Sequence, residues 1–204
     1  LSDVEHVALR QGAHRYMSTL TNSVAFAKTH TANIKKFDMP LFHAETTRAA
    51  MYVIRNPLDV VDSLSDHWGL SIDSTIDHMA NPDQYASNPI GSGANNASSM
   101  KGYLASWSIN AKSWTENADF PVLLLKYEDM LADPQKQFTR VVQFLGAPFN
   151  AQQIERATRF SAFKEVKKQE QQSGFAVLSA NSKDKQFFRH GKAERWREVL
   201  SRTH

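Results

Sequence analysis

Runs of apolar and polar residues divide the chain into predicted strands and helices. A continuous apolar run, FPVLLL, opens residues 120–130 and is typical of a strand buried in a parallel sheet. Residues 50–55 (AMYVIR) predict a second strand, and residues 24–27 predict a short third one. Amphipathic patterns predict helices over residues 2–20, 57–68, 71–81, 100–117, 134–145, 150–160, 161–174 and 193–201.

Residues that favour helix ends support these boundaries. Ser2 and Glu5 have the spacing of a capping box. Asn56 is expected to cap the next helix, with Pro57 at its first position and Gly69 after its last turn. The alternation of strands and helices predicts an α/β fold with three layers, in which helices flank a central parallel sheet.

Composition narrows the classes of function without selecting one. The 204 residues carry a formal net charge of +3, which fits an anionic small ligand as well as a nucleic acid. There are no cysteines, so disulfides, thiolate zinc sites and cysteine nucleophiles are excluded, and a cytoplasmic location is expected. No apolar run approaches the roughly 18 residues that a membrane span needs.

Several catalytic motifs are missing from the sequence. It contains no GxxxxGK[ST] phosphate loop, no GxGxxG dinucleotide motif, no HExxH metal motif and no GxSxG nucleophile elbow. His43 and Glu45 are too isolated to indicate a metal site, and we expect no metal. The chemistry must therefore be sought where predicted strands end and helices begin, which is where such folds bind ligands. Residues 28–30, 55–57 and 126–128 lie at junctions of this kind.

Arg55 lies between a predicted strand and a predicted helix. The free N–H groups of a helix N-terminus and a guanidinium fork both suit a phosphate. Ser63, eight residues later, could add a hydroxyl donor. The alternative is a surface arginine that pairs with Asp59 or Asp62.

The segment KTH offers a base beside a cation. His30 belongs to the residue type best suited to accept a proton near neutral pH, and Lys28 would lie on the same side of an extended chain. This pair suits the attack of a hydroxyl on an anionic centre. The alternative is a histidine that only forms a hydrogen bond at the end of a strand.

Basic residues outnumber acidic ones between Lys183 and Arg202. This segment could close over a polyanionic ligand, with the backbone N–H of Gly191 close to a phosphate. The alternative is a solvated basic loop and helix.

These segments, in their order, resemble the sulfotransferases that use 3′-phosphoadenosine-5′-phosphosulfate (PAPS), and they are most similar to bacterial members of the cytosolic-type family. The resemblance covers nearly the whole chain and implies a fold like that of P-loop nucleotide kinases. It rests on AFAKTH, YVIRNPLDVVDSL, VLLLKYEDMLADPQKQFTRVVQFLG, SAFKEVKKQE and FFRHGKAERWREVLS.

The resemblance implies a role for each matching residue. His30 corresponds to the general base, and Lys28 to a lysine that stabilises charge at the transferring sulfuryl group. The remaining matches are expected to bind the cofactor. Arg55 and Ser63 match the pair that holds the 3′-phosphate, Arg189, His190 and Gly191 match an Arg-Lys-Gly element at the same phosphate, and Tyr127, Ser161 and Phe163 match residues near the adenine.

Two departures from the family pattern stand out. His190 replaces the lysine of the Arg-Lys-Gly element, which reduces positive charge above the pKa of the imidazole. The loop that holds the 5′-phosphosulfate, a PKSGTTW-like segment, is absent before the first helix, and the helix expected after WREVLS is absent too. We therefore expect residues 1–204 to be a single sulfotransferase domain that is incomplete at both ends.

The sequence leaves more than one function open. The main hypothesis is sulfuryl transfer from PAPS to the hydroxyl of a small-molecule acceptor, with 3′-phosphoadenosine-5′-phosphate (PAP) as product and with no membrane or nucleic acid as partner. A homodimer is possible. One alternative is a catalytically defective module that binds PAP or a partner. Another is a nucleic-acid binder, although aromatic and basic residues do not interleave on a strand face. The acceptor pocket could involve residues 82–99, His67 and Trp68.

Overall fold

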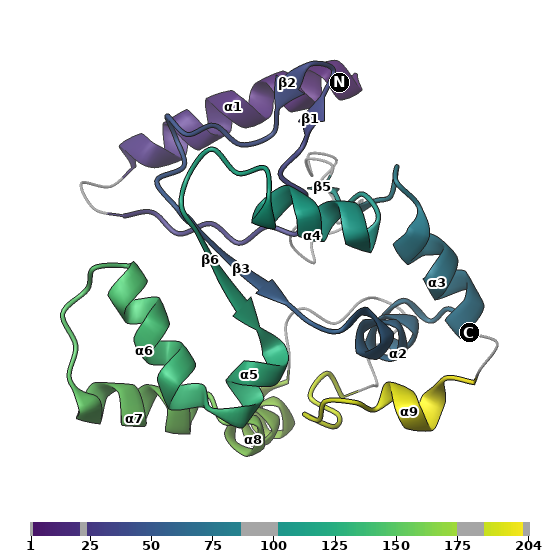
Figure 1. The fold of residues 1–204 in the computed structure, drawn as a ribbon, viewed down its shortest axis with the longest axis vertical. Helices are drawn as coiled ribbons and strands as arrows, with labels where there is room; N and C mark the ends of the chain where they lie inside the picture. The colour runs from purple at the N-terminus through teal and green to yellow at the C-terminus, as the bar shows by residue number, and fades with distance from the viewer. Residues whose placement is uncertain (1, 21–23, 87–101, 175–185, 202–204) are drawn as a thin grey trace. The chain divides into compact units, whose positions relative to one another are not determined.

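The computed structural model describes residues 2–20, 24–86, 102–174 and 186–201 as helices joined by short strands and loops (Figure 1). The chain divides into two compact units. The N-terminal unit comprises residues 1–50 and 78–122, and the C-terminal unit comprises residues 51–77 and 123–204. Helix α3 (Ile72–Ala80) contains the boundary between them in the sequence.

The N-terminal unit is built on one long helix and two small hairpins. Its helix α1 is capped as predicted, because the side chains of Ser2 and Glu5 each accept the backbone N–H of the other. Val7, Leu41 and Tyr103 form the buried core. The elements are α1 (Asp3–Thr19), the antiparallel pair β1 (Lys35–Lys36) and β2 (Met39–Pro40), the antiparallel pair β4 (Tyr85–Ala86) and β5 (Gly102–Tyr103), and α4 (Trp107–Thr115).

Except for their first residues, Ala50 and Val122, the two predicted central strands belong to the C-terminal unit. β3 (Ala50–Ile54) pairs with β6 (Val122–Lys126), and the two run in the same direction (Figure 1). The helices are α2 (Pro57–Trp68), α5 (Tyr127–Ala132), α6 (Pro134–Phe144), α7 (Ala151–Phe160), α8 (Phe163–Ser173) and α9 (Trp196–Val199). Helix α2 follows β3 as the sequence predicted. Helix α5 was not predicted, because it begins at Tyr127 within residues 120–130, where the sequence predicted a strand.

Helix α2 follows the predicted boundaries in detail. The Asn56 side chain accepts the N–H of Leu58, Pro57 occupies the first helical position, and Gly69 ends the helix with φ of 69°. This local chemistry places Arg55 directly between strand and helix.

Three further predicted elements differ from the structure. Residues 24–27 form no strand: they join no ladder within the described residues, and Val24 and Phe26 are exposed. The helix predicted over residues 100–117 starts only at Trp107, since Ser106 caps it and residues 102–103 pair with β4. Most of the predicted loop over residues 82–99 lies outside the described residues.

The third difference is the terminal helix, which spans four residues instead of residues 193–201. Its start is delayed because the chain ahead of it is turned onto α2. Glu194 has φ of 62°, and the carboxylate of Asp59 accepts the N–H of Glu194 at 2.8 Å and the N–H of Trp196 at 3.0 Å. The side chain of Asp59 is 1% exposed, so these charge-assisted bonds are shielded from water.

Replacing Asp59 with alanine is expected to lower the free energy of unfolding by about 2–4 kcal/mol, because two backbone N–H groups lose a buried charged acceptor. Urea denaturation followed by circular dichroism measures this change. The control is Glu198→Ala, which removes an exposed carboxylate and should change stability by less than about 0.5 kcal/mol. Equal destabilisation by the two variants would contradict the anchoring role of Asp59.

Candidate functional site

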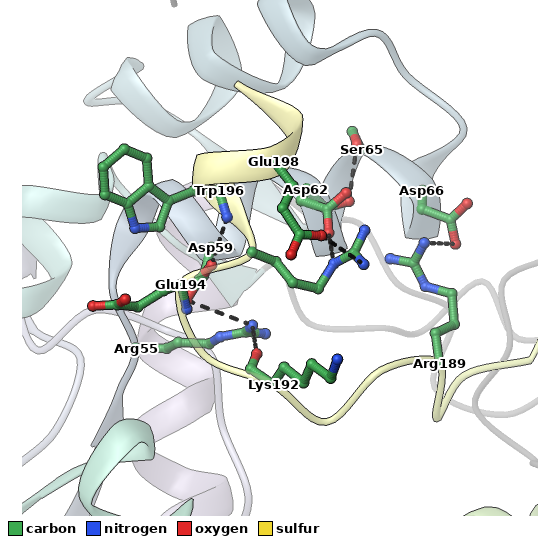
Figure 2. A network of polar contacts seen from close by, with 11 residues as sticks. Arg55, Asp59, Asp62, Ser65, Asp66, Arg189, Lys192, Glu194, Trp196 and Glu198 are labelled. Atoms are coloured by element: carbon green, nitrogen blue, oxygen red, sulfur yellow. Dashed lines mark hydrogen bonds and ion pairs between the residues drawn. The ribbon is translucent and has the colours of Figure 1, made fainter. Parts of the chain in front are cut away.

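A polar network joins α2 to residues 189–198 in the C-terminal unit (Figure 2). Three aspartates lie on one face of α2, since they are spaced three and four residues apart. Each faces an arginine. The pairs are Asp59 with Arg55 at 3.9 Å, Asp62 with Arg195 at 3.2 Å and Asp66 with Arg189 at 3.3 Å. The network therefore concentrates three guanidinium groups beside one helix.

Arg55 is held in place by three neighbouring residues. Its Nη2 donates to the carbonyl of Lys192 at 3.2 Å and lies 3.9 Å from Asp59. The centre of its guanidinium group lies 4.7 Å from the centre of the Tyr127 ring. The Nε atom is buried and has no hydrogen-bond partner among the described residues. Buried polar groups normally have a hydrogen-bond partner, so this Nε–H could still donate to a ligand.

The two strand-to-helix junctions of this unit lie together, as predicted for parallel strands. Glu128, the second residue of α5, accepts the backbone N–H of Asn56 at 2.8 Å. Tyr127 precedes it and places its ring beside Arg55. The third predicted junction, at residues 28–30, belongs to the N-terminal unit and is described separately below.

Gly191 follows Arg189 and His190 in a turn that only glycine accommodates. Its φ is 62°, and a Cβ atom at this position would overlap the ring of Phe163. Phe163 is the first residue of α8, and its ring also meets that of Phe188 edge to face, with centres 6.3 Å apart. The predicted residues Phe163, Arg189 and Gly191 are therefore brought together.

Helix α8 fixes the same turn through two polar side chains. The carboxylate of Glu170, which is 8% exposed, accepts the N–H groups of Phe187 and Phe188. Lys167 donates to the carbonyl of Arg189 at 3.2 Å. These bonds leave the Arg189 side chain directed toward α2 (Figure 2).

Three other predicted residues are placed less directly. Ser63 is exposed on α2, three residues before Asp66 and four after Asp59, and so shares their side of the helix. Ser161 ends α7, and its hydroxyl donates within that helix to the carbonyl of Ala157 at 3.0 Å. Its donor is thus already used.

His190 is exposed beside the arginines. The pKa of its imidazole lies below the ordinary value, first through desolvation and then through the positive charges of Arg195 and Arg189. The neutral form is therefore favoured at neutral pH.

The N-terminal unit holds the KTH segment by its backbone. Asn110 of α4 donates to the carbonyl of His30 at 3.2 Å, and Trp114 donates to the carbonyl of Thr31 at 3.2 Å. The side chains of Lys28 and His30 are solvent-accessible, but nearby protein removes part of the hydration of His30. This desolvation and the charge of Lys28 lower the pKa of His30. A neutral imidazole of this kind can accept a proton at neutral pH.

Sequence reasoning identified only part of the network that holds the site together: it gave Asp59 and Asp62 as alternative partners of Arg55, and it did not identify Asp66 or Glu170. The spacing of the aspartates could have predicted the acidic face of α2, since residues 59, 62 and 66 lie on one side of a helix. Glu170 gave no such signal, because it lies in a strongly polar helix and becomes buried only through packing on distant residues.

Two further findings concern the described residues alone. No helix over residues 2–20, 24–86, 102–174 or 186–201 has both the length and the apolar character to cross a membrane. In the same ranges, no three side chains of the metal-binding types come together in a way that could hold a metal ion.

Solved structures share this fold. Mouse sulfotransferase SULT7A1 complexed with PAP matches with a TM-score of 0.55 and 22% identity, over 75% of this chain and 52% of that one. Retinol dehydratase in complex with androsterone and inactive cofactor PAP matches with a TM-score of 0.62 and 22% identity, over 100% of this chain and 59% of that one. These likenesses confirm the predicted α/β fold.

Sequence comparison identifies the family. Rat Sulfotransferase 2A1 is 27% identical over 149 residues, covering 72% of this chain and 47% of its own length. Bovine Sulfotransferase 1A1 is 31% identical over 64 residues, covering 31% of this chain and 22% of its own length. The chain thus spans less than half the length of these relatives. The family profile described as "Sulfotransferase domain" matches residues 13–204. The chain therefore belongs to the sulfotransferase domain family.

Proposed function

We propose that the complete protein is a sulfotransferase that moves a sulfuryl group from PAPS to the hydroxyl of a small-molecule acceptor. The observation that carries this proposal is that Arg55 and Arg189 both lie along α2, with Arg55 bonded to the carbonyl of Lys192, the residue that follows Gly191. Within this proposal, Arg55, Arg189 and Gly191 bind the 3′-phosphate of PAPS and of its product PAP. Family membership and the PAP named in the two solved relatives support the choice of nucleotide.

The chemistry of the described residues fits a phosphate. Two guanidinium groups offer planar donor forks, and Arg55 keeps one buried N–H without a partner. The N-terminus of helix α2, which carries a partial positive charge, lies two residues after Arg55 at the carboxyl end of β3. Gly191 has φ of 62° and lies against the ring of Phe163, a conformation and a contact that a residue with a side chain could not adopt. Ser63 adds an exposed hydroxyl on the same helix.

The adenine contacts proposed for Tyr127, Ser161 and Phe163 have unequal support. Tyr127 and Phe163 present aromatic rings beside Arg55 and Gly191 respectively. Ser161 has its hydroxyl engaged within α7, so its contribution would come through its acceptor lone pairs.

Within the proposed reaction, PAPS supplies a sulfuryl group activated by its 5′-phosphate. His30 accepts the proton of the acceptor hydroxyl while the hydroxyl oxygen forms a bond to sulfur. The bond between sulfur and the 5′-phosphate oxygen breaks, which leaves PAP and a sulfate ester. Lys28 places positive charge near the transferring group. The lowered pKa of His30 supports its role, because it keeps the imidazole neutral at neutral pH.

Arg55→Ala is expected to weaken PAP binding by roughly 30-fold or more, since losing one partner of the proposed contact between guanidinium and phosphate costs about 2 kcal/mol or more. Adenosine 5′-phosphosulfate (APS) lacks the 3′-phosphate, so its affinity should change by less than about threefold. Calorimetric titration of the full-length protein measures both ligands. Arg159→Ala removes an exposed arginine from α7 and is the control for net charge. Equal losses for PAP and APS would mean that Arg55 serves the fold alone.

His30→Ala is expected to reduce turnover by roughly 100-fold or more and to leave PAP affinity unchanged, because general-base catalysis contributes about 10²–10⁴-fold. Turnover is measured as sulfate-ester formation from PAPS with a panel of phenols and alcohols. His78→Ala, which removes an exposed histidine from α3, is the control. Full activity of His30→Ala would refute the base assignment. PAP binding without any transfer by the unmodified full-length protein would favour the PAP-binding module instead.

His190 should make PAP binding depend on pH. Because its pKa is lowered in the free protein, the imidazole is neutral at pH 8 and gains a proton as the pH falls, which strengthens binding of the 3′-phosphate. His190→Lys stays charged throughout. We expect this variant to bind PAP about two- to fivefold more tightly at pH 8, and the difference to shrink as the pH falls and His190 gains its proton. The ratio of the PAP affinities of the two proteins is compared at each pH, because the titration of the phosphate itself affects both proteins equally and cancels in this ratio. A ratio that does not change with pH would exclude His190 from the site.

A further inference from the structure

Arg189 is not free to receive an anion in this structure. Its Nη1 lies 3.3 Å from Oδ2 of Asp66, and the two side chains are 26% and 29% exposed (Figure 2). The ion pair therefore lies at the edge of the network, where a ligand from solvent can reach it. Any phosphate that uses Arg189 has to share or displace this carboxylate.

The other two pairs on α2 behave differently. Asp59 is buried and bound to two backbone N–H groups, so it is fixed whether or not a ligand is present. Asp62 pairs with Arg195, which has no role in the proposed phosphate site. Among the three pairs, the one formed by Asp66 combines a proposed phosphate ligand with solvent access.

Electrostatics then sets the sign of the effect. A carboxylate within a few ångströms of a phosphate dianion is repelled by it, and the repulsion is strong near a protein surface. If Asp66 stays beside Arg189, it repels the phosphate. If it moves away, the protein loses an ion pair when the nucleotide binds. Both cases lower the affinity for a 3′-phosphate.

We infer that Asp66 is a counter-charge that competes with the nucleotide phosphate for Arg189 and weakens the binding of PAPS and PAP. This inference rests on the proposed 3′-phosphate site. Differences in affinity between variants of one site appear mostly in the dissociation rate. Asp66 therefore speeds the release of PAP and determines how tightly the product is retained.

Asp66→Asn, compared with Asp62→Asn, tests the inference in the full-length protein. Both substitutions remove one negative charge from the same face of α2, but only the first frees Arg189. We expect Asp66→Asn to bind PAP roughly three- to tenfold more tightly, with slower dissociation in stopped-flow measurements. APS affinity should stay unchanged in both variants, and Asp62→Asn should leave PAP affinity within about twofold.

A second pair of variants separates failure of this inference from failure of the proposed function. Arg189→Ala should weaken PAP binding, and adding Asp66→Asn to it should bring no gain, because the two residues act through one contact. Unchanged or weaker PAP binding by Asp66→Asn, or equal tightening by Asp62→Asn, would overturn the inference while Arg189→Ala still supports the site. If Arg189→Ala leaves PAP affinity unchanged, the 3′-phosphate site itself is wrong.

Discussion

The buried carboxylate of Asp59 is the interaction on which the C-terminal unit depends. It receives two backbone N–H groups from residues 194 and 196, and Arg55 lies 3.9 Å away. A carboxylate that is 1% exposed requires such compensation, because an unpaired charge in the protein interior is strongly unfavourable. Satisfying this charge holds residues 194 and 196 against the first half of α2 and leaves the carbonyl of Lys192 bonded to Arg55, whereas Arg189 pairs with Asp66 in the last turn of the same helix. The proposed phosphate site therefore follows from charge compensation inside the unit.

Similar pairing of charges changes which ligands the basic C-terminal segment is expected to bind. Taken as a sequence, residues 183–202 suggested a surface that attracts any polyanion. In the described part of that segment, Arg189 pairs with Asp66, Arg195 with Asp62 and Arg197 with Glu194. Much of the positive charge is thus neutralised by neighbours before a ligand arrives. A site of this kind favours a ligand that contacts particular guanidinium groups over one that responds to net charge alone, and this supports a compact phosphate over a nucleic acid.

Local signals explain which parts of the fold could be predicted. Asn56, Pro57 and Gly69 fix α2 through their own backbone preferences, and the apolar run before Lys126 fixes β6. The prediction of a strand over residues 24–27 was wrong because a strand needs a partner strand, and no local sequence pattern supplies one. Phe163 contacts Gly191, which lies 28 positions later in the sequence. The buried Glu170 bonds to Phe187, which lies 17 positions later. Such contacts depend on how helices pack, so the resemblance to a family could name Phe163 and Gly191, but nothing in the sequence could name Glu170.

The two sets of proposed site residues rest on different packing. The backbone beside His30 is held by Asn110 and Trp114 in the N-terminal unit, whereas the proposed phosphate ligands are held by α2 and α8 in the C-terminal unit. A side-chain substitution in one set leaves the hydrogen bonds that position the other set intact. The proposed proton abstraction and the proposed nucleotide binding can therefore vary separately, which matters because a sulfotransferase that uses PAPS has to bind its donor and then release a product bearing the same 3′-phosphate. Tight binding alone would slow that release, and an aspartate that competes for one arginine balances the two demands without disturbing the base.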